Sequence, residues 1–199
     1  MSSNRLPYLD FMVEMVNSCA SSIEGGTLVL FTNYSDLRHC YQSLLPRWQK
    51  LGRSVYAQGE GLSRSAPRQK MIEEQDVLVL GAESFWKGFD AKGPCLSQVI
   101  ITRLPFENPS HPVLEAKSEL LVKEGKSSFM ELTLPSAVIR FRQGMGRLIR
   151  SKNDVGELLI MDSRILKKGY GKDFIREFPK RDYEIISSSE LMPNLSEDF

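Results

Sequence analysis

Two arginines near the end of a predicted helix carry the most suggestive chemistry in this chain. They belong to the octet Gln143-Gly144-Met145-Gly146-Arg147-Leu148-Ile149-Arg150. Arg147 and Arg150 are three positions apart, so on a helix they point the same way and are separated by about one turn. Each guanidinium is always charged and presents a fork of N–H donors that fits phosphate oxygens. The octet therefore suggests a polyphosphate site, although a surface ion pair at a helix C-terminus, where cations are favoured, explains it equally well.

The segment before the octet is predicted to be a helix that begins at Leu134. Ala137, Val138 and Phe141 are expected to face the core from one side of it. The arginines would then lie at the exposed end of a buried helix, where paired guanidiniums suit a polyphosphate ligand.

The rest of the chain alternates short apolar runs with segments of helical periodicity. The runs lack polar alternation, which is typical of strands that are covered on both faces. We predict strands at 27–32, 54–57, 76–81, 98–102 and 156–161, with a further candidate at 183–186. We predict helices at 6–23, 35–51, 68–74, 111–123, 134–149 and 170–178. This order predicts an α/β fold in which a mostly parallel sheet has helices on both faces.

The loop after the first predicted strand is a candidate binding segment, because ligands of such sheets bind beyond the carboxyl ends of the strands. It contains Thr32, Asn33 and Ser35. Small polar residues at a strand-to-helix turn, together with the N–H groups of a helix start, can form an anion site. Ordinary capping of the following helix is the alternative interpretation.

The segment 82–94 after the third predicted strand is expected to be a long functional loop. It carries aromatic side chains around a lysine: Phe85, Trp86, Lys87 and Phe89. Such a set could form a stacking surface for a single nucleic-acid strand, although we expect at least one of the aromatics to belong to the core. Gly88 would allow close approach of a backbone, and Asp90 could accept from a sugar hydroxyl or orient an arginine.

Composition excludes several classes of protein. The chain has 26 basic and 25 acidic residues and a formal net charge of +1, so nucleic-acid binding would have to come from local placement of charge. Cys19, Cys40 and Cys95 match no metal-ligand spacing and, as an odd and unpaired set, suit a reducing cytoplasmic compartment. No run of about 18 apolar residues and no signal peptide is recognisable, so no membrane contact is expected.

The sequence also lacks several catalytic signatures. His39 and His111 are expected to be ordinary helix and turn residues, and no serine–histidine–aspartate order or metal-binding cluster occurs. The P-loop spacing Gly-x-x-x-x-Gly-Lys-Ser/Thr is absent, and so is an Asp-Glu box that would hold Mg²⁺. The chain therefore has arginines that suit a transferring phosphoryl group but nothing to cradle the phosphates of a nucleotide.

Several segments resemble motifs of superfamily 2 helicases. Residues 143–150 resemble motif VI, residues 28–37 resemble motif IV with its strand, and Glu83-Ser84-Phe85-Trp86-Lys87-Gly88-Phe89-Asp90 resembles motif V of the DinG/XPD branch. Arg103-Leu104-Pro105-Phe106, followed by Pro109 and Pro112, and Asp162-Ser163-Arg164 are also similar to that branch. The motifs occur in the family's order between Thr27 and Phe178. The chain thus resembles the C-terminal RecA-like domain, the second motor domain, of a DinG-like helicase.

The resemblance implies a three-layer α/β/α sandwich and a role for each matched residue. Family members bind ATP between two RecA-like domains, of which the first supplies the P-loop and the Mg²⁺ ligands. It implies that Arg147 and Arg150 face the γ-phosphate, with Gln143 beside them. It also implies that Gly88, Asp90 and Gly146 couple the nucleotide state to the strength of DNA binding. Thr32, Asn33 and Ser84 would contact the DNA backbone and so form part of the path of the single strand, the DNA track, and Trp86 would support this track.

Further implications concern the whole enzyme. The resemblance implies an ATP-dependent DNA helicase that moves 5′ to 3′ on single-stranded DNA in DNA repair. An iron–sulfur cluster, where the family has one, would lie in the first domain, which this chain lacks. The chain is therefore expected to be part of a longer polypeptide and inactive alone as an ATPase. We expect one RecA-like domain at 1–186 and a polar, flexible tail at 187–199.

Two alternatives remain at this point. The same fold could be a stand-alone module that binds nucleic acid or a protein without catalysis. An unrelated doubly wound enzyme, such as a methyltransferase, would need a glycine-rich loop after the first strand, and Asn33-Tyr34-Ser35-Asp36 does not supply one.

Overall fold

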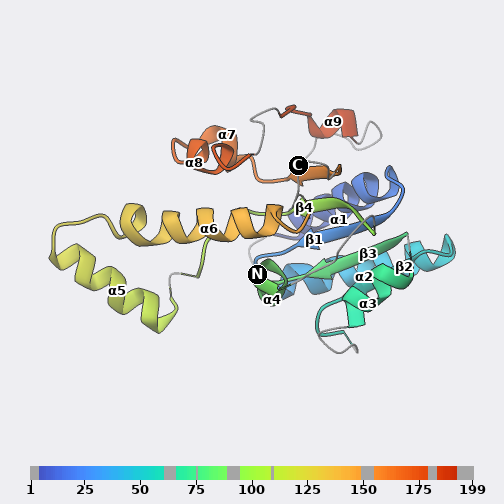
Figure 1. Cartoon of the computed structure of the whole chain (residues 1–199), viewed down its shortest axis with the longest axis horizontal. Helices are drawn as coiled ribbons and strands as arrows, with labels where there is room; N and C mark the ends of the chain where they lie inside the picture. The colour runs from blue at the N-terminus through green and yellow to red at the C-terminus, as the bar shows by residue number, and fades with distance from the viewer. Residues whose placement is uncertain are drawn as a thin grey trace.

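The computed structural model describes residues 5–60, 66–74, 76–88, 95–108, 110–148, 155–178 and 183–191. These residues form a five-stranded sheet in the order β2-β3-β1-β4-β5, in which every neighbouring pair is parallel (Figure 1). The strands are β1 Gly26–Leu30, β2 Ser54–Ala57, β3 Val77–Gly81, β4 Leu96–Ile101 and β5 Glu157–Ile160. The predicted α/β class with a mostly parallel sheet is confirmed.

Helices connect the strands and cover the sheet. They are α1 Arg5–Ser21, α2 Tyr34–Lys50, α3 Ala66–Glu73, α4 Glu83–Gly88, α5 Pro112–Lys123, α6 Leu134–Met145, α7 Arg164–Lys167, α8 Gly171–Ile175 and α9 Ser188–Leu191, with a π-helical turn, η1 Phe129–Thr133, before α6. Helix α5 extends away from the sheet, and none of its residues is buried (Figure 1). Among the described helices, none has the length and apolar character needed to cross a membrane.

The core has two halves, one on each face of the sheet. Val29 and Phe31 belong to the half that contains apolar residues of α1 and α2, whereas Leu28 and Leu30 belong to the half that contains those of α4 and α6. Successive strand residues point to opposite faces, and every residue of β1 is buried. Burial on both faces therefore explains why the apolar run of β1 shows no polar alternation.

Three predicted elements differ from the structure. Segment 82–94 begins as a helix rather than a loop, because Phe85 and Trp86 are buried and Phe85 N donates to Ala82 O at 2.7 Å. Residues 183–186 form no strand, and Tyr183 and Ile185 are exposed.

The third difference concerns the octet. Helix α6 ends at Met145, and residues 146–148 continue as a turn in which Arg147 N donates to Gly144 O at 3.1 Å. Glycine weakens a helix, and glycines occupy positions 144 and 146. Arg147 therefore lies on a turn after the helix, not on the helix itself.

A short helix lies within the segment that was expected to be a flexible tail. Helix α9 contacts α1, where Ser18 Oγ donates to Leu191 O at 2.8 Å. Leu191 packs against the core half that contains α1. Residues 188–191 are thus part of the packed domain, whereas residues 192–199 lie outside the described part of the chain.

Candidate nucleotide and nucleic-acid site

The contact between α4 and the last turn of α6 brings two of the motif-bearing segments together. Gly144 is buried on α6, and a Cβ atom placed there would lie 2.8 Å from Cζ3 of Trp86 and 3.1 Å from Cδ1 of Leu30. Only glycine allows the indole to approach the helix this closely. Helix α4 therefore packs directly against the end of α6, and the turn that carries Arg147 follows this contact.

Arg147 is oriented by the main chain of the helix that precedes it. Its Nε donates to the carbonyl oxygen of Gln143 at 2.9 Å, and both residues are partly exposed. On the far side of the turn, Leu148 is buried beside Gly156, where a Cβ atom would lie 2.6 Å from Cδ1 of Leu148. The turn is thus fixed on both sides of Arg147, with Gly146 as the C-cap of α6.

Two predicted nucleotide-site residues cannot be placed. Arg150 and Asp90 lie outside the residues that the structure describes, and only the main chain of Gly88 is described, as the end of α4. Their roles therefore stay predictions.

Trp86 is a structural support rather than a surface for bases. Its side chain is 1% exposed, and its indole Nε1 donates to the carbonyl oxygen of Phe31 at 2.8 Å. A buried indole offers no face to a base, so the assignment of Trp86 to the DNA-binding set stays a prediction of support for the track rather than of direct contact. The expectation that at least one aromatic of this segment belongs to the core is confirmed by Trp86 and Phe85, which are both buried.

The turn between β1 and α2 presents one predicted DNA-contact residue and uses another as a cap. Asn33 is the N-cap of α2: its Oδ1 accepts from Asp36 N at 2.8 Å, and its Nδ2 donates to Asp36 Oδ2 at 2.9 Å. Ordinary capping, the alternative interpretation of this turn, is thus confirmed for Asn33. Thr32 is exposed next to the cap, so its side chain can be reached by a ligand.

Gln58 joins three loops and was not identified from the sequence. It is 9% exposed and follows β2 directly. Its Oε1 accepts from Ala82 N at 2.8 Å, and its Nε2 donates both to Ser84 Oγ at 2.8 Å and to the hydroxyl of Tyr34. The predicted contact residue Ser84 is exposed and is held by this network. The sequence feature that could have indicated Gln58 is its position as a polar residue directly after a predicted strand.

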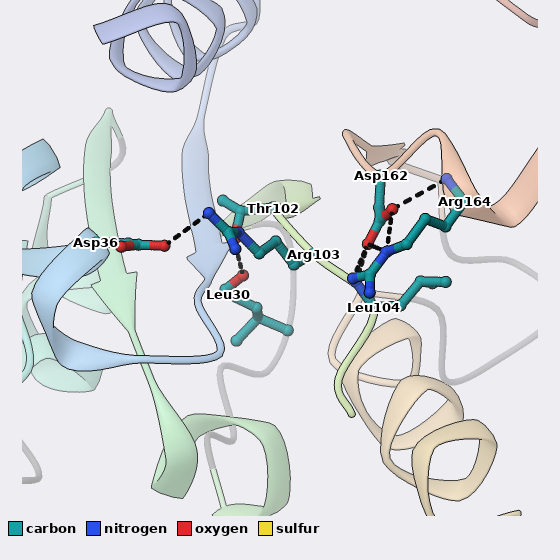
Figure 2. Close-up of polar contacts among 7 residues, drawn as sticks. All are labelled: Leu30, Asp36, Thr102, Arg103, Leu104, Asp162 and Arg164. Atoms are coloured by element: carbon teal, nitrogen blue, oxygen red, sulfur yellow. Dashed lines mark hydrogen bonds and ion pairs between the residues drawn. The ribbon is translucent and has the colours of Figure 1, made fainter. Parts of the chain in front are cut away.

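The ends of β4 and β5 are joined by an aspartate. Asp162 Oδ2 accepts from Leu104 N at 2.8 Å, and the Asp162 carboxylate also binds the Arg164 guanidinium, with a shortest distance of 2.6 Å (Figure 2). Figure 2 also shows that Arg103 reaches toward Asp36, with 3.3 Å between Nη2 and Oδ2. The segments 103–106 and 162–164, which resemble the helicase branch, therefore have mainly a structural role: their hydrogen bonds hold the ends of β4 and β5 together.

Asp162→Asn should lower the Tm near neutral pH by roughly 4–8 °C, because the loss of a charge-assisted bond costs about 2 kcal/mol. Burial raises the pKa of Asp162, but hydrogen bonds from Arg164 and from Leu104 N outweigh burial and lower this pKa below the usual value of an aspartate. The carboxylate therefore stabilises the fold above the unfolded pKa of about 3.9, and this contribution is lost as pH falls through the folded pKa. Thermal unfolding measured from pH 7 to pH 2 should show the two proteins converging in acid.

Asp173→Asn is the matched control for that experiment. Asp173 pairs with Arg176 at 2.9 Å on the surface, where such pairs contribute about 0–1 kcal/mol. If Asp162→Asn had the same Tm as wild type at pH 7, Asp162 would not stabilise the fold by linking the ends of β4 and β5.

Neither a P-loop nor a metal site is found in the described part of the chain. Gly125-Lys126-Ser127 has the end of a P-loop sequence, but it follows helix α5 rather than a strand, and Lys126 Nζ pairs with Glu124 at 2.8 Å. The described residues hold no group of three histidine, cysteine or acidic side chains suited to a metal ion. Among the residues that the structure describes, Arg147 thus stays the arginine predicted to bind a phosphate group, and none of them forms a P-loop.

Two of the cysteines are buried thiols. Cys19 and Cys40 form no disulfide bond. Burial, reinforced by Glu157, raises the pKa of Cys19 to about 11, and burial, reinforced by Asp36, raises that of Cys40 to about 12. Both thiols therefore stay protonated and unreactive at neutral pH.

Comparison with known proteins adds to this geometry. The family model described as "Helicase C-terminal domain" matches residues 16–181. The "3'-5' exonuclease DinG" of Bacillus subtilis is 40% identical over 165 residues, which are 82% of this chain and 18% of that protein. The "ATP-dependent DNA helicase YoaA" of Haemophilus influenzae is 33% identical over 178 residues, which are 89% of this chain and 27% of that protein. The chain thus spans between 18% and 27% of the length of these relatives.

Solved structures support the fold. A structure titled "XPD_Helicase" matches with a TM-score of 0.63 and 19% identity, covering 83% of this chain and 29% of that one. At this identity the match concerns the fold alone. It confirms the predicted RecA-like α/β architecture.

Proposed function

Because this chain belongs to the helicase C-terminal domain family, in the DinG/XPD group, we propose that it is the second motor domain of an ATP-dependent DNA helicase. The observation that carries this proposal is the packing of Trp86 onto Gly144. This contact joins helix α4 to the end of α6, which the turn with Arg147 follows. A nucleotide-dependent movement of that turn would be transmitted through this contact to β1, since Trp86 also binds the Phe31 carbonyl.

In this proposal the nucleotide site is shared between two domains. A first RecA-like domain of the same polypeptide holds ATP and Mg²⁺, and this domain supplies Arg147 and Arg150 to the γ-phosphate. Charge on the transferring phosphoryl group spreads over its outer oxygens, and a forked guanidinium stabilises that charge in the transition state. Gln143, whose carbonyl orients Arg147, lies beside the fingers, while Gly146, Gly88 and Asp90 couple nucleotide state to DNA grip.

The single-stranded DNA track in this proposal crosses the carboxyl ends of the strands. Thr32 and Ser84 are exposed there and contact the DNA backbone, Asn33 fixes the turn as a cap, and Trp86 supports the track from below. We assign 5′ to 3′ movement, a cytoplasmic location and a role in DNA repair from the family resemblance. An iron–sulfur cluster, if the polypeptide has one, belongs to the first domain.

A second function follows from one relative's name. The Bacillus subtilis relative is called an exonuclease, so the polypeptide that contains this domain could degrade DNA instead of unwinding it. In that case this chain serves as a module that binds nucleic acid without performing catalysis itself.

The proposal is tested by the ATPase activity of this chain with and without the first domain. We expect the 199-residue chain to show no turnover above background, with or without single-stranded DNA, because its sequence lacks the P-loop spacing. A polypeptide that joins the chain to a P-loop domain should hydrolyse ATP, and single-stranded DNA should stimulate it. Turnover by this chain alone, or a joined polypeptide that unwinds nothing and only degrades DNA, would refute the motor assignment.

A further inference from the structure

Tyr34 presents an exposed aromatic ring at the proposed DNA track. It is the first residue of α2, directly after the turn that carries Thr32 and Asn33, and it is 48% exposed. The indole of Trp86 is buried under the same edge of the sheet, so it offers no face to a base. Tyr34 has the exposed ring that Trp86 lacks.

The orientation of Tyr34 is the reverse of the usual one. A tyrosine at a surface ordinarily buries its ring and keeps its hydroxyl in water. Here the hydroxyl accepts a hydrogen bond from Nε2 of Gln58, which is almost fully buried, while Tyr34 as a whole residue remains about half exposed. The hydroxyl therefore acts as a tether, and an apolar ring is left exposed.

The turn after β2 lies beside this ring. Gly59 has a φ of +86°, which favours glycine, and a Cβ atom there would lie 3.7 Å from Cε1 of Tyr34. A side chain at this position would therefore pack against the ring edge, whereas glycine leaves that edge accessible. A ring tethered at its hydroxyl loses less freedom than a free one when a base stacks on its open face.

Polar groups that suit a nucleic-acid backbone surround this ring. Ser84 Oγ and the Tyr34 hydroxyl bind the same nitrogen of Gln58, so the two side chains are neighbours. Arg38 lies one turn further along α2, 66% exposed, with its Nε 3.0 Å from Glu60. An aromatic face next to hydroxyl and cationic groups is the composition of a single-strand binding surface.

We propose that Tyr34 stacks on a base of single-stranded DNA and that Gln58 positions its ring. This inference rests on the proposed function, since it assigns a base contact within the same track. Thr32 and Ser84 contact the backbone without reading bases, while Tyr34 supplies the contact with the base face.

The test compares binding to two fluorescein-labelled strands of equal length, an oligothymidylate and its abasic counterpart, by fluorescence anisotropy. For this chain, Tyr34→Ala should raise the Kd for the thymidylate strand about tenfold or more and leave the Kd for the abasic strand nearly unchanged. Tyr34→Phe keeps the ring and should bind much more tightly than Tyr34→Ala. Tyr183→Ala is the matched control, because Tyr183 is equally exposed, at 50%, and packs on Phe178 instead.

Gln58→Leu tests the positioning role. It should weaken thymidylate binding less than Tyr34→Ala does, and the double variant should bind no more weakly than Tyr34→Ala alone, because Gln58 acts through the ring. Circular dichroism and thermal unfolding should be measured for each variant, to show that a change in binding does not arise from loss of the fold.

The outcomes separate the two proposals. Thymidylate binding that is equal for wild type and Tyr34→Ala overturns the stacking inference and leaves the motor assignment standing. An equal loss on both strands also overturns it, because Tyr34 would then contact only the backbone. If wild type binds neither strand, the DNA track itself is refuted, and the stacking inference with it.

Discussion

Arg147→Ala should lower the kcat for ATP hydrolysis about 10³-fold or more in a polypeptide that joins this domain to a P-loop domain. The reason is that the guanidinium stabilises charge that develops on the transferring phosphoryl group, so its loss affects the transition state far more than the bound nucleotide. Steady-state kinetics at saturating single-stranded DNA measures the effect. The Kd for DNA should change little, because the proposed DNA track consists of other residues.

The matched control is an arginine in the last turn of the preceding helix. Arg142 lies on α6, five residues before Arg147; its side chain is 64% exposed and lies 3.6 Å from Glu177. Such surface pairs contribute about 0–1 kcal/mol, so Arg142→Ala should leave kcat within about twofold of wild type. Wild-type turnover by Arg147→Ala would show that Arg147 is not an arginine finger. An equal loss in both variants would point to disruption of α6.

The lysine variant separates charge from shape. Arg147→Lys retains one positive charge, but it lacks both the fork of donors and the Nε that binds the Gln143 carbonyl. We expect it to recover only a small part of the lost kcat. Full recovery would mean that the site requires a nearby charge and not a guanidinium held by the main chain.

The strands were predictable because a buried strand appears in the sequence as a short run of apolar residues. β2 lies where its apolar run predicted it, and β1 differs from its prediction by a residue or two at each end. Residues of β1 face apolar partners on both sides of the sheet, so the run carries no polar interruption. The end of the octet was less predictable, since two glycines stop α6 before Arg147 and leave that residue on a turn.

The site was predictable in its motifs but not in its connections. The sequence places Trp86 near Gly88, yet nothing local indicates that its ring packs on Gly144, which is 58 positions later. Gln58 is a similar case, because its partners Tyr34 and Ala82 each lie 24 positions away. Such contacts depend on the order of strands in the sheet, which the spacing of residues along the chain does not determine.

Trp86→Ala should destabilise the domain by about 3–5 kcal/mol, which is the usual cost of truncating a buried aromatic residue. The side chain is 1% exposed, and its removal also leaves the Phe31 carbonyl without its indole donor. A whole domain is stable by about 5–15 kcal/mol, so this variant should unfold at a much lower urea concentration. Trp86→Phe retains most of the volume and should lose less, while Ile139→Ala, at an exposed position of α6, should change the midpoint little.

Gly144→Ala shows whether this destabilisation arises at the contact between α4 and α6. In wild type the added methyl group would lie 2.8 Å from the Trp86 ring, so Gly144→Ala alone should be destabilising. In the Trp86→Ala background the ring is gone and the methyl group enters the cavity, so the same substitution should be neutral or stabilising. A double-mutant cycle by urea unfolding measures this coupling. Additive effects would show that Trp86 stabilises the fold elsewhere, and Arg147 would then lose its structural connection to the DNA track.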